Sequence, residues 1–480
     1  MKPVLVIHGY SSEGKEKGVD EIYGNLPAEL RKTLGAENVR EIDLSRWISL
    51  NDGISLDDVS LAMDRALKAE CSDLLASGFH VIIHSTGALV SRNWIKKFSP
   101  KPSPVHNLIH LAGANFGSGL AHVGKGQLAR WGRALTIGTG CGFRILNELE
   151  FGSWKTLDMH LHFLQEGSRM IEDYQVQEYC IIGSQVPELY RFAPIRYVKE
   201  DSSDCTVRTS SGNLNFNYVS IAPGPNVLPD EQIQKMVDQR FNGKQVMGSY
   251  YKIETFSLAG EGSRTEIPFA IPYEIAHSGK DIGIVSGKKH RKDIRALIKA
   301  ALETPFDSVA YAITGEKFRA VKDATFKKAA KLSFELKEWN PREQYDGHAQ
   351  LIFRIRDQEG RPVEHFDVYL NSKKQNDKQV KLESMIEDDH ANKIYKGTIT
   401  FYLRTQKSGG RSRPWKDLLD AVAPLDLEIT GSEPLSKNIS YVPFRMRLAP
   451  DQIRNIVKSF QTTVIDRLPS PHVFDIIRRC

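Results

Sequence analysis

The 480-residue sequence predicts an α/β fold, a doubly wound and mostly parallel sheet, followed by an antiparallel β-sandwich. Two observations indicate the sheet: apolar, β-branched runs recur along residues 1–320, and helix-like stretches separate them. A third observation indicates the sandwich, because short alternating segments follow one another beyond residue 325. Since single cores stop growing beyond ~250–300 residues, we expect two domains, at 1–320 and 325–480.

Three apolar runs predict the central strands of the sheet. The first covers 3–8, the second ends in His84, and the third covers 107–111. Helix-like patterns at 23–34 and 56–77 lie between the first two runs. Strands that alternate with helices predict parallel pairing with helices on both faces.

The second run passes through His84-Ser85-Thr86-Gly87 directly into a helix-like pattern. This is how a serine is held at the tip of a strand-to-helix turn, the nucleophile elbow. Gly87 permits a sharp turn, and the helix directs its positive end toward developing negative charge. The usual motif is G-x-S-x-G, and Ile83 replaces the first glycine, which predicts a crowded turn. The alternative is a buried strand that happens to end in Ser-Thr-Gly.

With His8-Gly9 after the first strand, this elbow resembles the α/β-hydrolase superfamily, especially its lipase and esterase branch. The resemblance covers about residues 1–310. It implies that Ser85 is a nucleophile, followed along the chain by an acid and then a histidine. It also implies an oxyanion hole formed by the backbone N–H groups of Thr86 and of Tyr10, in the loop after the first strand.

The acid is expected in a polar loop after a strand-like run at 179–184. Lipases of this superfamily often carry Ser-Asp-Gly-x-Val there, and Ser203–Val207 resembles that segment with cysteine in place of glycine. The resemblance therefore favours Asp204 over Asp201 and Glu200. An ordinary solvated acidic turn is the alternative.

The general base is expected at His277, between a strand-like run and a helix at about 290–303. The superfamily places its histidine in the loop before the last helix, and the adjoining Ser278-Gly279 is common in lipases. His290 is the alternative, but it stands in a cluster of lysines and arginines that would depress its basicity.

The histidines near the elbow are expected to be structural. His8 and His84 should flank the site and hydrogen-bond loop backbone. A metal site formed by His8, His84 and His110 is a weaker interpretation, because paired-ligand spacing such as H-E-x-x-H does not occur. We therefore expect neither a metal nor a cofactor.

Residues 116–177 are long and helix-prone, with helix-like stretches at 127–135, 144–150 and 161–174. Hydrolases of this superfamily carry a cap or lid at this place. Its leucine, phenylalanine and tryptophan content favours an apolar acyl group over a sugar or a small polar ester. Core packing against the sheet is the alternative for most of these side chains.

The second domain is predicted from seven alternating, strand-like segments with little helix between them. They are 331–339, 350–356, 366–370, 396–404, 425–430, 441–448 and 473–477. Basic residues and Trp415 between 404 and 416 could touch lipid headgroups, although a solvated loop is the simpler interpretation.

The composition of the chain favours some classes of binding partner and one kind of cellular compartment. The net charge of +6 permits attraction to anionic lipid but argues against nucleic acid. Five scattered cysteines without Cys-x-x-Cys indicate a reducing compartment. No N-terminal signal pattern and no apolar run of ~20 residues is present, so we expect a cytoplasmic protein.

These observations predict a serine hydrolase that cleaves carboxylic esters of lipid-like substrates, as a lipase, phospholipase or esterase. The C-terminal domain could make peripheral contact with a membrane. A catalytically weak or inactive scaffold that binds lipid or protein is the alternative, and Ile83 is the feature that favours it. The acyl chain length, the headgroup and any protein partner are not predicted.

Overall fold

A computed structural model of the chain forms two compact units, which we call the α/β unit and the β unit. The α/β unit comprises Met1–Asn215, Arg264–Asp346 and Ser408–Trp415, and the β unit comprises Phe216–Ser263, Gly347–Lys407 and Lys416–Cys480. The structure describes residues 2–8, 23–49, 51–123, 142–187, 197, 199–222, 255–259, 264–288, 291–332, 340–357, 359–409, 414–432, 439–441, 444–467 and 476–478. The division into separable domains at 1–320 and 325–480 stays a prediction.

The α/β unit is built on a six-stranded sheet in the order β2-β1-β3-β4-β5-β8. Every neighbouring pair in it is parallel. The strands are β1 (Val4–His8), β2 (Val39–Asp43), β3 (Phe79–His84), β4 (Val105–Leu111), β5 (Gln177–Ile181) and β8 (Phe269–Ala270). The predicted parallel sheet is confirmed, and the three predicted central strands correspond to β1, β3 and β4.

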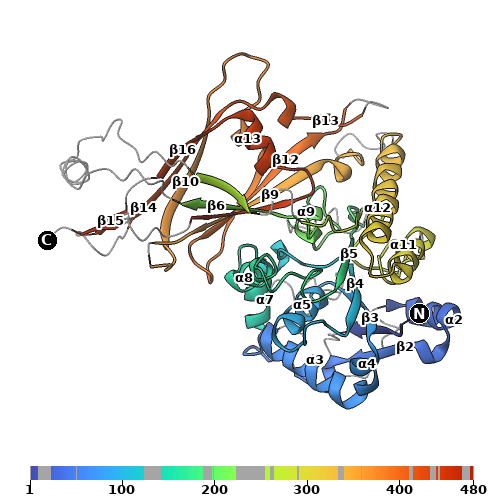
Figure 1. The fold of residues 1–480 in the computed structure, drawn as a ribbon. Coiled ribbons are helices and arrows are strands. Elements are labelled where there is room, and N and C mark those ends of the chain that lie inside the picture. Colours follow the sequence, from blue (N-terminus) through green and yellow to red (C-terminus); the bar gives the residue numbers. More distant parts are fainter. Residues whose placement is uncertain are drawn as a thin grey trace. The chain divides into compact units, whose positions relative to one another are not determined.

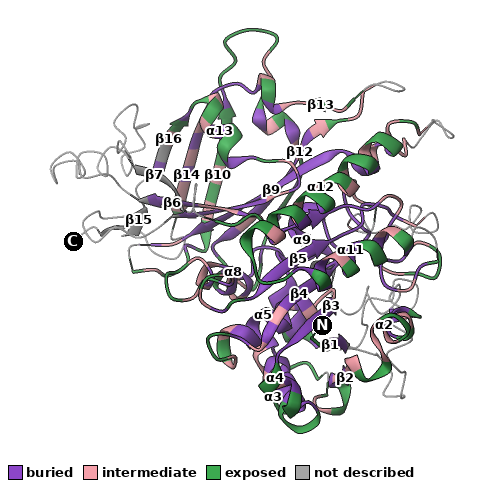
Figure 2. Cartoon of the chain, turned by 45° about the vertical axis from the view of Figure 1, so that its right-hand side comes forward, coloured by how far each residue is buried: buried purple, intermediate pink, exposed green. Residues whose placement is uncertain are grey.

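Helices cover both faces of this sheet (Figure 1). One face carries α2 (Leu26–Leu34), α11 (Arg291–Glu303) and α12 (Ser308–Ala329), and the other carries α3 (Leu56–Glu70), α4 (Ser72–Ser77) and α5 (Gly87–Lys97). On the first face Ile109 and Tyr179 of the sheet share a core with Leu297 and Phe318 of the helices. Figure 2 shows the buried strands and the exposed outer sides of α2, α3, α11 and α12, whereas α5 is mostly buried. The short helices of this unit are η1 (Ala36–Asn38), η2 (Leu44–Arg46), α9 (Thr209–Gly212) and η6 (Glu343–Tyr345).

The predicted cap region contains three described helices. They are η3 (Gly119–Val123), α7 (Phe143–Leu149) and α8 (Trp154–His162). Helix α7 corresponds to the prediction at 144–150. The helix predicted at 161–174 is wrong, because α8 ends at His162 and residues 163–174 contain turns but no helix. The helix predicted at 127–135 lies outside the described residues. Among the described helices, none has both the length and the apolar character needed to cross a membrane.

The β unit contains two sheets. The seven-stranded sheet has the order β11-β12-β9-β17-β6-β7, with β13 beside β12, and the five-stranded sheet has the order β10-β14-β15-β18, with β16 beside β14. Its strands are β6 (Asn217–Ala222), β7 (Thr255–Ala259), β9 (Gly347–Ile355), β10 (His365–Ser372), β11 (Ile386–Ala391), β12 (Thr398–Lys407), β13 (Lys416–Asp417), β14 (Leu425–Ser432), β15 (Ile439–Tyr441), β16 (Phe444–Leu448), β17 (Thr462–Arg467) and β18 (Ile476–Arg478). Its helices are η7 (Leu382–Met385), η8 (Leu419–Ala421) and α13 (Pro450–Ile456).

The two sheets enclose one apolar core, as in a sandwich. Leu351 and Phe353 of β9 belong to the same buried cluster as Leu427 and Ile429 of β14 and Ile456 of α13. The predicted sandwich is confirmed, with one addition: β17 pairs in parallel with both β6 and β9, and the remaining pairs are antiparallel. Of the predicted strands, residues 333–339 of the first, 442–443 of the sixth and 473–475 of the last lie outside the described residues.

Candidate active site

Ser85 stands at a sharp turn between β3, which ends at His84, and α5, which begins at Gly87. Its φ of 55° lies in the left-handed region, which is strained for a residue other than glycine. The turn is fixed by backbone hydrogen bonds, in which Ser85 N donates to Leu111 O over 3.1 Å and Ala114 N donates to Ser85 O over 3.3 Å. The end of β4 therefore holds the serine in its strained conformation.

Ile83 is accommodated at this turn although the usual motif has glycine there. Its side chain is fully buried. A Cβ atom added to Gly87 would lie 3.4 Å from the Cβ of Ile83, an ordinary van der Waals separation. Ile83 therefore packs against residue 87 without a clash, so the β-branched side chain does not prevent the sharp turn.

The structure brings Ser85, His277 and Asp204 into one hydrogen-bonded chain. The Ser85 Oγ lies 3.0 Å from Nε2 of His277, and Nδ1 of His277 lies 2.9 Å from Oδ2 of Asp204. The imidazole is 3% exposed and the carboxyl is fully buried. Because a carboxylate accepts, Nδ1 of His277 carries the proton, which leaves the Nε2 lone pair facing the serine hydroxyl.

Asp204 is held by the backbone of its own loop. Its Oδ1 accepts hydrogen bonds from the backbone N–H groups of Thr206, at 3.0 Å, and of Val207, at 2.8 Å. The loop turns at Cys205, whose φ is 79°. Burial and the charge of Asp204 raise the pKa of the Cys205 thiol, so this thiol stays protonated. Oδ1 is thereby occupied by the loop, and Oδ2 faces His277.

The neighbouring carboxylates have other partners. Glu200 accepts two hydrogen bonds from the buried guanidinium of Arg208, at 2.9 and 2.6 Å. Asp201 accepts from Nε2 of Gln344 over 3.0 Å. Of the three predicted acid candidates, the structure thus joins only Asp204 to His277 among the described contacts.

Two predicted residues lie outside the part of the chain that the structure describes. They are Tyr10, the second oxyanion donor, and His290, the alternative base. Thr86 is described, and it is the N-cap of α5. Its N–H group belongs to the first turn of the helix, where backbone donors have no partner within the helix.

The loop that carries His277 is attached at three points. His277 N donates to Asp204 O over 2.9 Å, and Gln185 N donates to Ile275 O over 3.0 Å. The third is a contact with the expected structural residue His84, whose Nε2 lies 3.1 Å from His277 O. Gly183 makes the close approach possible, because a Cβ atom there would lie 2.0 Å from Ile275 O. The expected bond from His84 to loop backbone is confirmed; the role of Gly183 was not predicted.

A buried ion cluster that the sequence analysis missed lies within the α/β unit. Arg92 of α5 donates to both carboxylate oxygens of Glu178 over 2.5 Å, and His110 of β4 lies 3.1 Å from Oε1 of Glu178. All three side chains are at most 3% exposed. Burial alone would raise the pKa of Glu178, but the charge of Arg92 and the bond to His110 outweigh it and lower that pKa to about 2. The sequence signal that could have revealed this cluster is a glutamate within an otherwise apolar strand.

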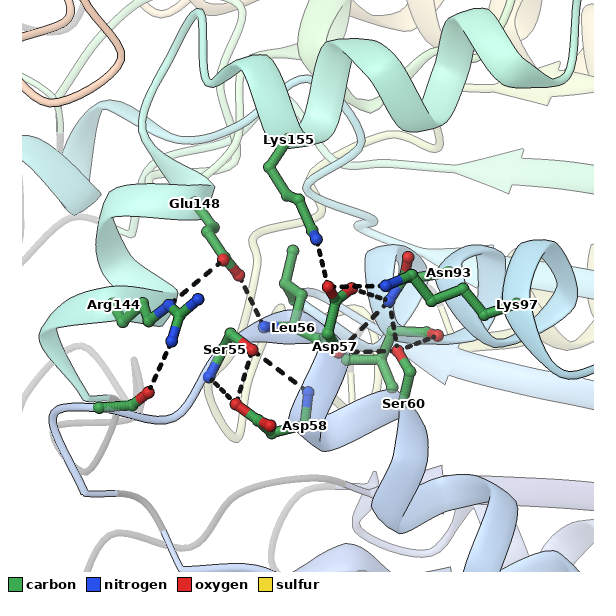
Figure 3. A network of polar contacts seen from close by, with 12 residues as sticks. Ser55, Leu56, Asp57, Asp58, Ser60, Asn93, Lys97, Arg144, Glu148 and Lys155 are labelled. Atoms are coloured by element: carbon green, nitrogen blue, oxygen red, sulfur yellow. Dashed lines mark hydrogen bonds and ion pairs between the residues drawn. The ribbon is translucent and has the colours of Figure 1, made fainter.

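A second polar network links the cap region to the elbow helix (Figure 3). Asp57, at the start of α3, accepts hydrogen bonds from Lys155 of α8 and from Asn93 of α5, the latter over 2.9 Å, and pairs with Lys97 over 2.7 Å. Burial would raise the pKa of Asp57, but bonds to Lys155, Lys97 and Asn93 lower it to about 2. The carboxylate therefore joins α3, α5 and α8.

The same helix start is capped from two sides. Within the chain, Ser55 and Asp58 form a capping box. From the cap region, Oε2 of Glu148 accepts from the backbone N–H of Leu56 over 2.6 Å, as Figure 3 shows. An acid at a helix N-terminus is favoured by the helix dipole. Helix α7 is thereby attached to α3 through Glu148.

In the described part of the chain, no group of three or more His, Cys, Asp or Glu side chains is arranged to hold a metal ion.

Comparisons with known proteins bear on the fold. A family model described as palmitoyl protein thioesterase matches residues 3–136. A search of curated proteins finds no match. The structure of phospholipase PlaB from Legionella pneumophila matches with a TM-score of 0.74 at 20% sequence identity, covering 97% of this chain and 93% of that chain. The structure of the same phospholipase in complex with thio-NAD matches with a TM-score of 0.73 at 21% identity, covering 98% and 93%.

The likeness to PlaB extends over nearly the full length of both chains, which at this level of identity is a likeness of fold. The family-model match covers the segment that contains the elbow serine. Both findings agree with the six-stranded parallel sheet. The predicted resemblance is confirmed at the level of the fold: this chain has an α/β-hydrolase fold.

Proposed function

We propose that this protein is a serine hydrolase that cleaves carboxylic esters of lipid-like substrates. The observation that carries the proposal is the hydrogen-bonded chain from Ser85 through His277 to Asp204, with 3.0 and 2.9 Å between its polar atoms. A serine hydroxyl becomes an effective nucleophile when an adjacent base takes its proton, and that base needs an orienting carboxylate.

The reaction then proceeds in two halves. Ser85 Oγ attacks the carbonyl carbon while its proton passes to Nε2 of His277, and the tetrahedral oxyanion accepts from the backbone N–H groups of Thr86 and Tyr10. The bond to the leaving alcohol breaks as His277 returns the proton to it. Water attacks the acyl-enzyme by the same route, which releases the acid and restores Ser85. Asp204 stays ionised and holds the imidazolium.

The lipid-like substrate is proposed from the cap region and from the relatives. Helices α7 and α8 carry buried apolar side chains, among them Leu146 and Leu157, and α8 packs against α5, the helix that follows Ser85. The family model carries the description of a palmitoyl protein thioesterase, and the matched structure that of a phospholipase. Peripheral membrane contact through the β unit and a cytoplasmic location belong to the same proposal.

A thioester substrate is the second candidate, because the matching family model is that of a thioesterase. The acyl-enzyme would be the same, with a thiol as the leaving group. A panel of acyl oxygen esters, phospholipids and acyl thioesters, with the products identified by mass spectrometry, separates the two. Faster release from thioesters of equal chain length would favour the second candidate.

Covalent labelling tests the nucleophile. A fluorophosphonate should label the wild-type protein, and Ser85→Ala should abolish labelling and ester turnover while leaving the fold intact. Loss of a triad member typically costs a factor of at least ~10⁴, so more than ~1% residual turnover would refute the assignment. A wild-type protein that is not labelled would favour the inactive scaffold.

The acid has a matched control in the same loop. Asp204→Asn should lower turnover by about 10³–10⁴, because the amide stabilises the wrong histidine tautomer. Asp201→Asn should change turnover little, since Asp201 bonds to Gln344 rather than to the imidazole. The reverse order of effects would show that the acid has been misassigned.

A further inference from the structure

His84 makes two contacts with the candidate base from the residue next to the nucleophile. Its Nε2 lies 3.1 Å from the backbone oxygen of His277. Its ring also lies beside the imidazole of His277, with 4.7 Å between ring centroids and 42° between ring planes. One side chain therefore contacts both the main chain and the side chain of residue 277.

The bond to the backbone fixes the protonation of His84. A carbonyl oxygen only accepts, so Nε2 of His84 carries a proton and donates it. Burial, and next the nearby His277, lower the pKa of His84 to about 3, so the ring stays neutral near neutral pH. A neutral ring adds no charge repulsion when His277 becomes an imidazolium.

His84 is itself contacted by a second buried ring. The fully buried ring of Tyr23 meets it edge-on, with 6.4 Å between centroids, and the Tyr23 hydroxyl donates to Ile7 O of β1 over 2.6 Å. Strand β3 supplies the backbone of His84. The ring thus stands on rigid elements, whereas His277 stands on a loop.

We propose that His84 is a positioning residue for His277. Its N–H anchors the main chain of the loop, and its ring limits rotation of the imidazole, so that Nε2 of His277 stays within 3.0 Å of Ser85 Oγ. This inference rests on the proposed function. Displacement of a catalytic group by about 1 Å can cost ~10²-fold in rate, which is the size of effect that positioning controls.

Three substitutions separate the two contacts. His84→Gln keeps an N–H donor without the ring, His84→Phe keeps a ring without the donor, and His84→Ala removes both. We expect kcat on a short soluble ester to fall by about 10–10²-fold in the alanine variant and by less in the other two. KM should change less than about twofold, because none of the variants alters a proposed substrate contact.

The matched control is His80→Gln, on the same strand. His80 is 5% exposed, and burial lowers its pKa to about 4. It pairs with Val4 in the sheet, four residues before His84. A purely structural loss should lower the melting temperature of both variants, whereas only the His84 variants should lose kcat at a temperature where all are folded.

Histidine NMR tests the same inference without turnover. In selectively labelled protein we expect the Nδ1–H proton of His277, bonded to Asp204, to be protected in wild type and in His80→Gln. It should broaden or exchange rapidly in His84→Ala. An unchanged resonance in folded His84→Ala would overturn the positioning role whether or not the protein hydrolyses esters, and so would a kcat within threefold of wild type. Failure of the proposed function would show instead as absent labelling of Ser85 in the wild-type protein.

Discussion

Replacing Glu178 by glutamine should destabilise the α/β unit strongly, because it leaves the charge of Arg92 buried. Arg92 is 3% exposed and donates to both oxygens of Glu178 over 2.5 Å. A guanidinium cannot lose its proton in a protein, so the buried positive charge would not be removed by deprotonation. Breaking a buried pair on one side costs about 3–5 kcal/mol.

The expected fall in melting temperature follows from the size of the unit. One kcal/mol shifts the melting temperature of a large domain by roughly 2 °C, so Glu178→Gln should lower it by about 6–10 °C. The double variant Arg92→Met with Glu178→Gln removes both charges, and it should recover much of the loss, because replacing a whole buried pair by apolar groups is often close to neutral. Calorimetry of the wild type, both single variants and the double variant gives the four melting temperatures of this double-mutant cycle.

The control is the exposed pair Lys299–Glu303 on α11, in which Glu303 is 49% exposed. Glu303→Gln should cost less than about 1 kcal/mol, since solvent screens such pairs. The reasoning would be refuted by a Glu178→Gln protein that melts within 2 °C of wild type. A double variant no more stable than the worse single variant would refute it as well.

The remaining predictions concern pH, the cap network and the loop of the candidate base. Since the pKa values of His80 and His84 are lowered to about 4 and 3, the unfolded chain binds protons there that the folded chain does not. Stability should therefore be lost as pH falls below 6.5, by at most ~1.4 kcal/mol per pH unit for each group, and equal denaturant midpoints at pH 7 and 5 would contradict this. Asp57→Asn should cost about 1 kcal/mol, since the carboxylate is one-third exposed, and should speed proteolysis within the cap region relative to wild type. Gly183→Ala places a Cβ 2.0 Å from Ile275 O, so it should lower the free energy of unfolding by about 1–3 kcal/mol and should also lower kcat. Wild-type values for both would show that the loop can move aside.

The parallel sheet could be predicted from the sequence because its signals are local. Each central strand is a short apolar run with a helix-like stretch beside it, and α/β topology follows from that alternation. The elbow could be predicted for the same reason, because Ser85 stands where an apolar, strand-like run passes directly into a helix-like pattern. Asp204 was predicted as the acid from the five-residue segment Ser203–Val207. This segment resembles the Ser-Asp-Gly-x-Val pattern of lipases although cysteine replaces glycine at its third position.

The composition of the β unit could not be predicted in this way, because strand pairing there joins distant parts of the chain. Strand β17 lies between β9 and β6, and the partners Thr463 and Asn217 are separated by more than 200 residues. A polar, mixed strand such as β6 gives no local sign of which sheet it joins. The buried Glu178 was missed for a related reason, since its partners Arg92 and His110 come from two other elements.

Both departures of this sequence from the lipase pattern replace a glycine at the candidate site, and the structure absorbs them differently. At the elbow, Ile83 fits without a clash, because even a Cβ atom on residue 87 would lie 3.4 Å from the Cβ of Ile83. In the acid loop, Cys205 adopts a φ of 79°, a conformation that favours glycine and costs an L-residue about 1–2 kcal/mol. That strain persists because Asp204 accepts from Thr206 N and Val207 N across the same turn, so relaxing the turn would break both bonds. The substitution at 205 therefore makes the turn depend on the Asp204 carboxyl that holds it, and it ties the conformation of the loop to the side chain that bonds to His277.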